Sequence, residues 1–229
     1  MEFDMKMKNN ILVAITALFL SSVIFLTAAE TKEGEGEGKE ATLIFSKKGA
    51  VLLEEDGKEP LAEKFKFEHC EWVFTEEGML GTRDKSHNAT ISATHSFNNV
   101  ILQFDIKFID SGAMKFVSWK RRSGHAFDVH VDQMAQSLVL LKGDLDGKEG
   151  PDKKARLAEK KGVSILINKW YTVTIEQKGD RAALHFDGHT LEVKHEGLLK
   201  ERWKFFINVG GKKKNEKTLI RNIKLWKAE

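Results

Sequence analysis

The sequence predicts an all-β protein built as an antiparallel β-sandwich. Three observations lead there: apolar and polar residues alternate in many short segments, Gly and Asp turns separate these segments, and very little of the chain has helical periodicity. Alternation puts every second side chain on the same face of a strand, so that one face can enter a core while the other stays polar. Many such strands with almost no helix are typical of two packed sheets.

The alternation is clearest in "VILQFDIKF" (100–108), "AFDVHVD" (126–132) and "WYTVTIEQ" (170–177). We predict that Leu102, Phe104, Val129 and Ile175 point into the core. Two segments near the end of the chain, "KFFINV" and "LIRNIKLW", show the same pattern.

The connections agree with this fold class. Residues 76–78, 179–180 and 187–188 combine Gly with acidic residues that tolerate the backbone angles of tight turns, which predicts hairpins there. Only residues 153–161 and 198–202 favour a helix.

The first 40 residues differ from the rest. A basic start, an apolar run over residues 11–26 and small residues before Glu30 predict a secretory signal peptide over residues 1–29. An uncleaved anchor is the alternative, although the run is short for a membrane span. Residues 30–40 alternate Gly with Glu and predict a flexible linker. We therefore expect a β-sandwich domain over residues 41–229, secreted or periplasmic, with no membrane span after cleavage.

Composition narrows the choice of partners. A formal net charge of +3 in 229 residues gives no reason to expect a nucleic-acid partner. Cys70 is the only cysteine, so the chain has no intrachain disulfide. We expect Cys70 to be a small buried residue, with a catalytic thiol as the alternative.

The stretch "LLEEDGKEPL" (52–61) contains Glu54, Asp56 and Glu59 in an E-x-D-x-x-E pattern, which one family of β-sandwich glycosidases uses. Positions five apart fall on opposite faces of a regular strand. The Asp-Gly pair and Pro60 favour a reversal of the chain. We interpret the stretch as a hairpin turn.

Four segments carry a resemblance to known proteins. "NKWYTVTIEQKGDRAALHFDGHTLEV" resembles the laminin-G and concanavalin A-like lectin/glucanase superfamily, whose fold is a jelly-roll β-sandwich. "EWVFTEEGMLGT", "NVILQFDIKF" and "LIRNIKLW" look like the corresponding strands of the 3-keto-disaccharide hydrolase domain family. The likeness spans roughly residues 65–228, and it implies a domain that acts on glycosidic bonds.

The chain departs from that family in two segments. "SGAMKFVSW" stands where the family has Gly-Asn-Ser-Gly, and "FDVHVD" stands where it has a Tyr-Glu-Val-Gln strand ending in Asp. On that correspondence, Asp128 replaces a Glu, His130 replaces a Gln, and Asp132 matches the Asp.

These residues form the main candidate site. Asp128, His130 and Asp132 share one strand face at steps of about 6.6–7 Å. Under the hydrolase resemblance, Asp128 and His130 serve as acid and base, while Trp119, Arg121 and Asp132 bind the sugar. The alternatives are a plainly solvated sheet face and, for Trp119, a place in the core.

A second candidate is the acidic loop "KGDLDGKEGPDKK". Asp144, Asp146 and Asp152 (with Glu149) could hold a structural calcium ion, although a solvated loop explains the same composition. We expect no other cofactor.

Two functions remain open. One is hydrolysis of glycosides, and the other is non-catalytic binding of glycans or of the cell envelope. Carbohydrate is the expected partner in both, and the sequence leaves the oligomeric state open.

Overall fold

The computed structural model describes residues 41–120, 124–143 and 153–229. The predicted signal peptide and linker lie outside these residues, as do Arg121 and the acidic residues Asp144, Asp146 and Asp152. Among the described residues, no helix combines the length and the apolarity that a membrane crossing requires.

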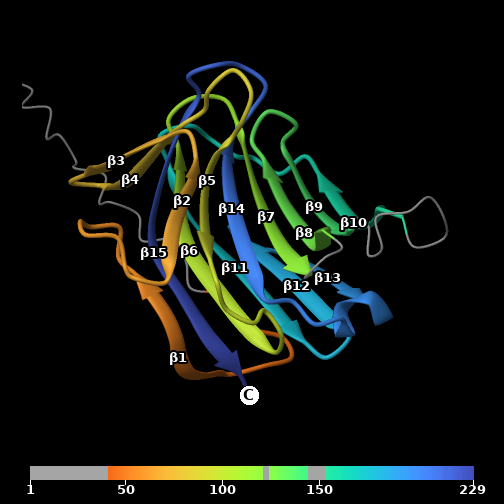
Figure 1. Cartoon of the computed structure of the whole chain (residues 1–229). Helices are drawn as coiled ribbons and strands as arrows, with labels where there is room; N and C mark the ends of the chain where they lie inside the picture. Colours follow the sequence, from red (N-terminus) through yellow and green to blue (C-terminus); the bar gives the residue numbers. More distant parts are fainter. Residues whose placement is uncertain (1–40, 121–123, 144–152) are drawn as a thin grey trace, which may run out of the picture. The chain divides into compact units, whose positions relative to one another are not determined.

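Two antiparallel sheets make up the described chain, as the sequence predicts (Figure 1). Sheet A has eight strands in the order β13-β12-β11-β6-β15-β4-β3, with β1 also paired to β15. Its strands are β1 (Lys48–Glu55), β3 (Glu71–Thr75), β4 (Gly78–Thr82), β6 (Val100–Phe108), β11 (Trp170–Lys178), β12 (Arg181–Phe186), β13 (His189–Lys194) and β15 (Lys217–Ala228).

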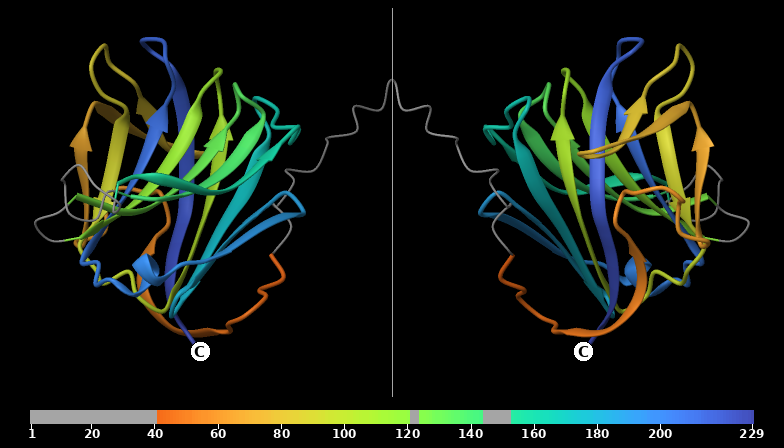
Figure 2. Two further views of the ribbon diagram at one scale, coloured as in Figure 1. Left: turned by 90° about the vertical axis from the view of Figure 1, so that its right-hand side faces the viewer. Right: turned by 90° about the vertical axis from the view of Figure 1, so that its left-hand side faces the viewer.

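Sheet B has seven strands in the order β10-β9-β8-β7-β14-β5-β2. Its strands are β2 (Phe65–His69), β5 (Ala89–Ala93), β7 (Ala113–Lys120), β8 (Gly124–Asp132), β9 (Ser137–Lys142), β10 (Ala155–Lys161) and β14 (Lys204–Gly210). Figure 2 shows the two layers from the side, with β1 in orange beside the C-terminal strand β15 in dark blue.

The core lies between the sheets and is made by the alternating side chains. Leu102, Phe104, Val129 and Ile175 are all fully buried and belong to one apolar cluster. The predicted inward faces are therefore confirmed. Burial of these side chains stabilises the fold, because it removes apolar surface from water.

The three predicted hairpins are confirmed. Residues 76–77 join β3 to β4, residues 179–180 join β11 to β12, and residues 187–188 join β12 to β13. Asp187 and Gly188 have φ angles of 45° and 78°, the left-handed conformations that a two-residue hairpin turn requires.

The stretch "LLEEDGKEPL" is not a hairpin, because β1 pairs with β15 in sheet A while β2 pairs with β5 in sheet B. The loop passes from one sheet to the other. Glu55, which is buried, holds it by accepting hydrogen bonds from the backbone N–H groups of Gly57 and Ala62. Glu54 Oε1 lies 2.6 Å from Lys224 Nζ on the neighbouring strand β15.

Of the two predicted helices, the first is wrong and the second lies near a short 3-10 helix. Residues 155–161 form strand β10 and not a helix, since they complete the edge of sheet B against β9. Lysine-rich, exposed edge strands of this kind discourage pairing with other chains. Near the second predicted helix, a short 3-10 helix η1 (Glu196–Leu199) is present.

A short segment of the chain covers part of the outer face of sheet A. Residues 44–46, which we call the strap, bind the carboxylate of Glu176 on β11. Ile44 N and Ser46 Oγ donate to it at 2.9 and 2.7 Å, and His185 of β12 lies 2.5 Å from Oε1. His185 is consequently buried.

Candidate functional site

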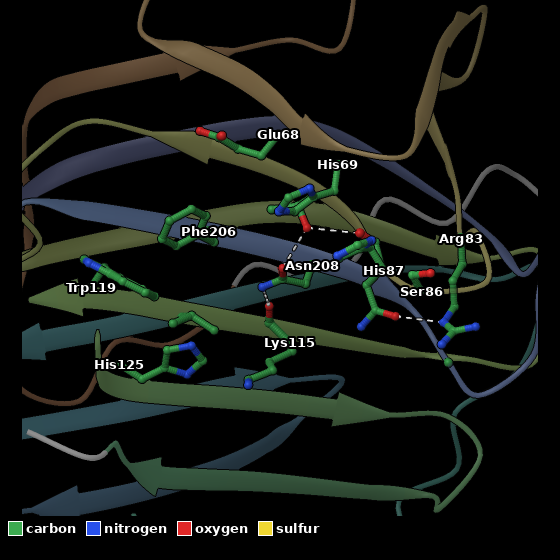
Figure 3. Close-up of a pocket in the computed structure, with 14 residues that line it drawn as sticks. Glu68, His69, Arg83, Ser86, His87, Lys115, Trp119, His125, Phe206 and Asn208 are labelled. Atoms are coloured by element: carbon green, nitrogen blue, oxygen red, sulfur yellow. Dashed lines mark hydrogen bonds between the residues drawn. The ribbon is translucent and has the colours of Figure 1, made fainter. Parts of the chain in front are cut away.

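A pocket of about 520 Å³ lies on the outer face of sheet B (Figure 3). Strands β2, β5, β7, β8 and β14 contribute to it, together with the loop between β4 and β5. It is lined by Glu68, His69, Arg83, Ser86, His87, Asn88, Thr90, Lys115, Val117, Trp119, His125, Phe206, Asn208 and Gly211.

Strand alternation explains why these side chains face outward. On β7, Lys115, Val117 and Trp119 line the pocket, while the residues between them are buried on the core side. On β14, Phe206 and Asn208 line the pocket in the same way. Because β7 and β14 are paired, the two rows of side chains stand next to each other.

One end of the pocket is aromatic. Trp119 packs edge-on against Phe206, with ring centroids 5.6 Å apart, and its ring centroid lies 5.5 Å from that of His125. A register shift between Ser118 and Trp119 turns His125 toward the indole. We call Trp119, Phe206 and His125 the aromatic end.

The middle of the pocket holds a fixed amide. Asn208 Oδ1 accepts a hydrogen bond from the Thr90 hydroxyl at 2.8 Å, and Asn208 Nδ2 donates to the Lys115 carbonyl at 3.1 Å. These bonds orient the amide, and each of its polar atoms has a further site for a ligand.

The opposite end carries positive charge, and Figure 3 shows Arg83 and His87 there, away from Trp119. Arg83 Nε donates to Asn88 Oδ1 at 3.0 Å, and Arg83 Nη1 donates to the Asp84 carbonyl at 3.1 Å. The rings of His69 and His87 stack with centroids 4.8 Å apart. We call Arg83, His69 and His87 the basic end.

A glycine lets the chain approach this end closely. Gly210 has a φ of 144°, and a Cβ there would lie 2.9 Å from both Arg83 Cδ and Asn88 Oδ1. Any larger residue would therefore press on the side chains that form the wall.

Among the described residues, Glu68 is the only carboxylate that lines the pocket. It accepts hydrogen bonds from Lys204 Nζ at 2.6 Å and from Ser92 Oγ at 2.7 Å. The Lys204 bond, followed by the Ser92 bond, lowers the pKa of Glu68 below its usual range. Glu68 is therefore ionised and already paired at neutral pH.

Asp128 lies beneath the pocket and is fully buried. Its carboxylate oxygens are 3.0 Å from Lys154 Nζ, 3.3 Å from Lys115 Nζ and 3.2 Å from His125 Nδ1. Burial alone would raise the pKa of Asp128, but the His125 hydrogen bond and the two ammonium charges outweigh it and lower the pKa to about 2. Asp128 thus positions two side chains that line the pocket.

His130 follows on the same face of β8. Its Nε2 lies 4.0 Å from Asp128 Oδ2. Burial, reinforced by the charges of Lys115 and Lys154, lowers the pKa of His130 to about 4 despite the opposing effect of Asp128 and Asp132. The imidazole is neutral at pH 7.

The predicted site residues are only partly brought together. Trp119 lines the pocket, so its alternative place in the core is wrong. Asp128 and His130 lie close to each other, but neither lines the pocket. Asp132 accepts a hydrogen bond from Ala135 N at 2.8 Å and so shapes the turn after β8.

Sequence reasoning missed most of the pocket. The pattern in "KFFINV" predicts Phe206 and Asn208 only as part of a strand, and nothing in the sequence indicates the basic end. The one usable signal is Phe206, an aromatic residue at an outward position between the polar residues Lys204 and Asn208. Their partners on β5 and β7 are about 90–120 residues away in the chain.

No group of three or more metal-ligating side chains occurs among residues 41–120, 124–143 and 153–229. The acidic loop predicted to bind calcium lies outside those ranges.

No protein-family model matches the chain, and no curated protein matches it in sequence. Its structure is similar to that of carbohydrate-binding module CBM66 from Bacillus subtilis, with a TM-score of 0.54, 19% identity, and 71% of this chain and 95% of that chain covered. A Bacillus subtilis protein of unknown function with a galectin-like fold gives a TM-score of 0.59 at 13% identity, covering 80% and 99% of the two chains.

The exoplasmic/lumenal domain of VIP36, bound to Ca²⁺ and Man3GlcNAc, gives a TM-score of 0.56 at 10% identity, covering 76% of this chain and 89% of that one. At such identities the likeness concerns the fold. The described chain is an antiparallel jelly-roll β-sandwich.

Proposed function

We propose that this protein binds carbohydrate without cleaving it, and that the pocket on sheet B is the binding site. The observation that carries the proposal is the combination of an aromatic end with an oriented amide beside it. A sugar ring presents an apolar face that can pack on Trp119, and hydroxyls that can exchange hydrogen bonds with Asn208 and Lys115.

The distribution of carboxylates favours binding over hydrolysis. Glycosidases commonly place two carboxyl groups on either side of the scissile bond, one of them with a raised pKa. Here Glu68 is the one carboxylate among the described lining residues, and it already accepts hydrogen bonds from Lys204 and Ser92.

The alternative is the glycoside hydrolysis implied by the resemblance to 3-keto-disaccharide hydrolases. It assigns acid–base work to Asp128 and His130. Asp128, with a pKa of about 2 and no exposed surface, is poorly suited to deliver or accept a proton at neutral pH. In our proposal Asp128 instead holds Lys115 and His125 in place.

The similar structures add support, since one is a carbohydrate-binding module and another contains a bound oligosaccharide. Export, which the predicted signal peptide would direct, would bring the domain to glycans outside the cytoplasm.

The test compares two tryptophans on opposite faces of the sandwich. Trp119 of sheet B and Trp226 of sheet A are both half-buried, but only Trp119 lines the pocket. Binding to a panel of oligosaccharides should weaken at least about tenfold in Trp119→Ala, because truncating a central aromatic hot-spot residue costs about 2 kcal/mol or more. The matched variant Trp226→Ala should bind as the parent does.

Equal loss in both variants, or no loss in either, would remove the pocket from the proposal. For the hydrolase alternative, the parent protein is incubated with 3-keto-glucosides and ordinary disaccharides. We expect no released monosaccharide. Release that disappears in Asp128→Asn or His130→Ala would establish hydrolysis instead.

A further inference from the structure

We propose that the glycan bound in this pocket is acidic, with a sugar carboxylate at the basic end. This inference rests on the proposed function and specifies its ligand class. The starting observation is that the described lining side chains are unequal in charge. Arg83 and Lys115 carry fixed positive charge, and Glu68 is the single acid among them.

Three negative groups near the pocket are already engaged. Glu68 is bound to Lys204, a cation outside the lining. The carboxylate of Asp84 turns back into its own loop, where it accepts hydrogen bonds from the N–H groups of Ser86 and His87, both at 2.6 Å. Asp128 is shared between Lys115 and Lys154. Among the described side chains that line the pocket, fixed positive charge therefore outweighs the paired negative charge.

The guanidinium of Arg83 is held in a defined orientation. Its Nε and Nη1 groups are tied to Asn88 and to the Asp84 carbonyl, and no bond to Nη2 is seen among the described residues. A planar guanidinium fixed on one side can present its remaining N–H groups to a carboxylate. A neutral sugar offers the guanidinium only hydroxyl groups, and these accept weaker hydrogen bonds than a carboxylate does.

In this proposal the two ends of the pocket bind different parts of the ligand. The aromatic end takes the apolar face of one sugar ring, and the basic end takes the carboxylate of the same ring or of its neighbour. Asn208 and Lys115 lie between them and reach the hydroxyls (Figure 3). A uronic-acid oligosaccharide has this sequence of groups.

The experiment measures calorimetric affinities of the full chain for a set of uronic-acid oligosaccharides (oligogalacturonate, oligomannuronate and a hyaluronan fragment). Each is paired with its methyl ester, which keeps the sugar and removes the charge. A sulfated galactan fragment tests the other common source of negative charge. Variants are Arg83→Gln, Arg83→Lys and, as the control, Arg156→Gln on the exposed edge strand β10.

We expect one of the acids to bind at least about tenfold more tightly than its ester, as a charge-assisted hydrogen bond would give. Salt should weaken that binding. Arg83→Gln should abolish the preference for the acid, Arg83→Lys should keep part of it, and Arg156→Gln should leave it intact. Unchanged binding of the ester by Arg83→Gln shows that the variant is folded.

The failures are distinguishable. If esters and neutral sugars bind as tightly as the acids, the acidic ligand is wrong while the glycan-binding function stands. If only the sulfated fragment binds, the carboxylate assignment is overturned. If nothing in this set or in the neutral panel binds, the proposed function falls as well.

Discussion

The outer faces of the two sheets are both polar by alternation, yet they differ in how their polar groups are used. On sheet A, the buried carboxylate of Glu176 is occupied by Ile44, Phe45 and Ser46 of the strap and by His185. On the outer face of sheet B, Asn208 of β14 and Arg83 of the loop between β4 and β5 make some hydrogen bonds with the protein. Their side chains can still form further hydrogen bonds with a ligand.

What separates the two faces is a covering segment of chain. Where the strap lies over sheet A, the polar groups serve stability, because buried hydrogen-bonding groups must find partners within the protein. Sheet B is not covered in this way by any described segment, and outward polar side chains there line a pocket that a ligand can enter. The comparison therefore predicts that mutations on sheet A change stability, whereas mutations in the pocket change binding.

The largest effect is expected at the centre of the covered face. Glu176→Ala leaves the donors of the strap and His185 without their acceptor, so the free energy of unfolding should fall by about 3 kcal/mol. Urea denaturation measures it. Glu192→Ala on the exposed strand β13 serves as the control and should cost less than about 1 kcal/mol, since it removes only a surface ion pair with Arg181.

The same carboxylate adds a pH dependence. Burial raises the pKa of Glu176, but the hydrogen bonds from His185, Ser46 and the strap backbone outweigh it and lower the pKa below 4.5. Its contribution to stability is therefore complete above pH 4.5 and is lost as the pH falls further. Glu176→Ala should flatten the acid limb of the stability curve. A loss of glycan affinity in this variant, with stability unchanged, would contradict the comparison.

A smaller effect is expected beside the pocket. His130 has a folded-state pKa of about 4 against an ordinary value of 6.5, so the unfolded state binds more protons between these values. Stability should therefore decrease as the pH falls from 6.5 toward 4. His130→Gln removes this term, which should reduce the loss between pH 7 and pH 5 by up to about 2 kcal/mol.

Comparing urea midpoints of the parent and the variant at the two pH values measures that term. Equal pH dependence in both proteins would mean that His130 titrates as it does in water.

The smallest effect is expected at the carboxylates of "LLEEDGKEPL". The double variant Glu54→Gln, Glu59→Gln removes the exposed ion pair with Lys224, which should cost no more than about 0.5 kcal/mol. Glycan binding should be unchanged because these residues are not in the pocket. A marked loss of binding or turnover would revive the E-x-D-x-x-E site.

The fold was largely predictable because alternation depends only on neighbours in sequence. Phe104 and Val129 could be placed in the core from spacing alone. Strand β10 could not, since "ARLAEKK" has no alternating apolar face, and its pairing with β9 decides its conformation.

The site was less predictable because its parts meet across strands. Spacing placed Asp128 on the outer face, but its burial depends on Lys115, His125 and Lys154, which come from other positions in the chain. His185 shows the converse: its burial depends on the strap, about 140 residues earlier in the sequence. The face to which a side chain points can be predicted from strand alternation. The groups that cover it come from distant parts of the sequence and cannot be predicted in this way.

Mapping the bound glycan by NMR tests the central claim most directly. Amide and Trp indole shifts of ¹⁵N-labelled protein are followed during titration with the oligogalacturonate series and with the neutral panel. We predict shifts in β7, β14, residues 83–90 and the Trp119 indole, with little change in Trp226 or around Glu176. Shifts concentrated on the outer face of sheet A, or absent from Trp119 at saturating glycan, would contradict the assignment of the pocket.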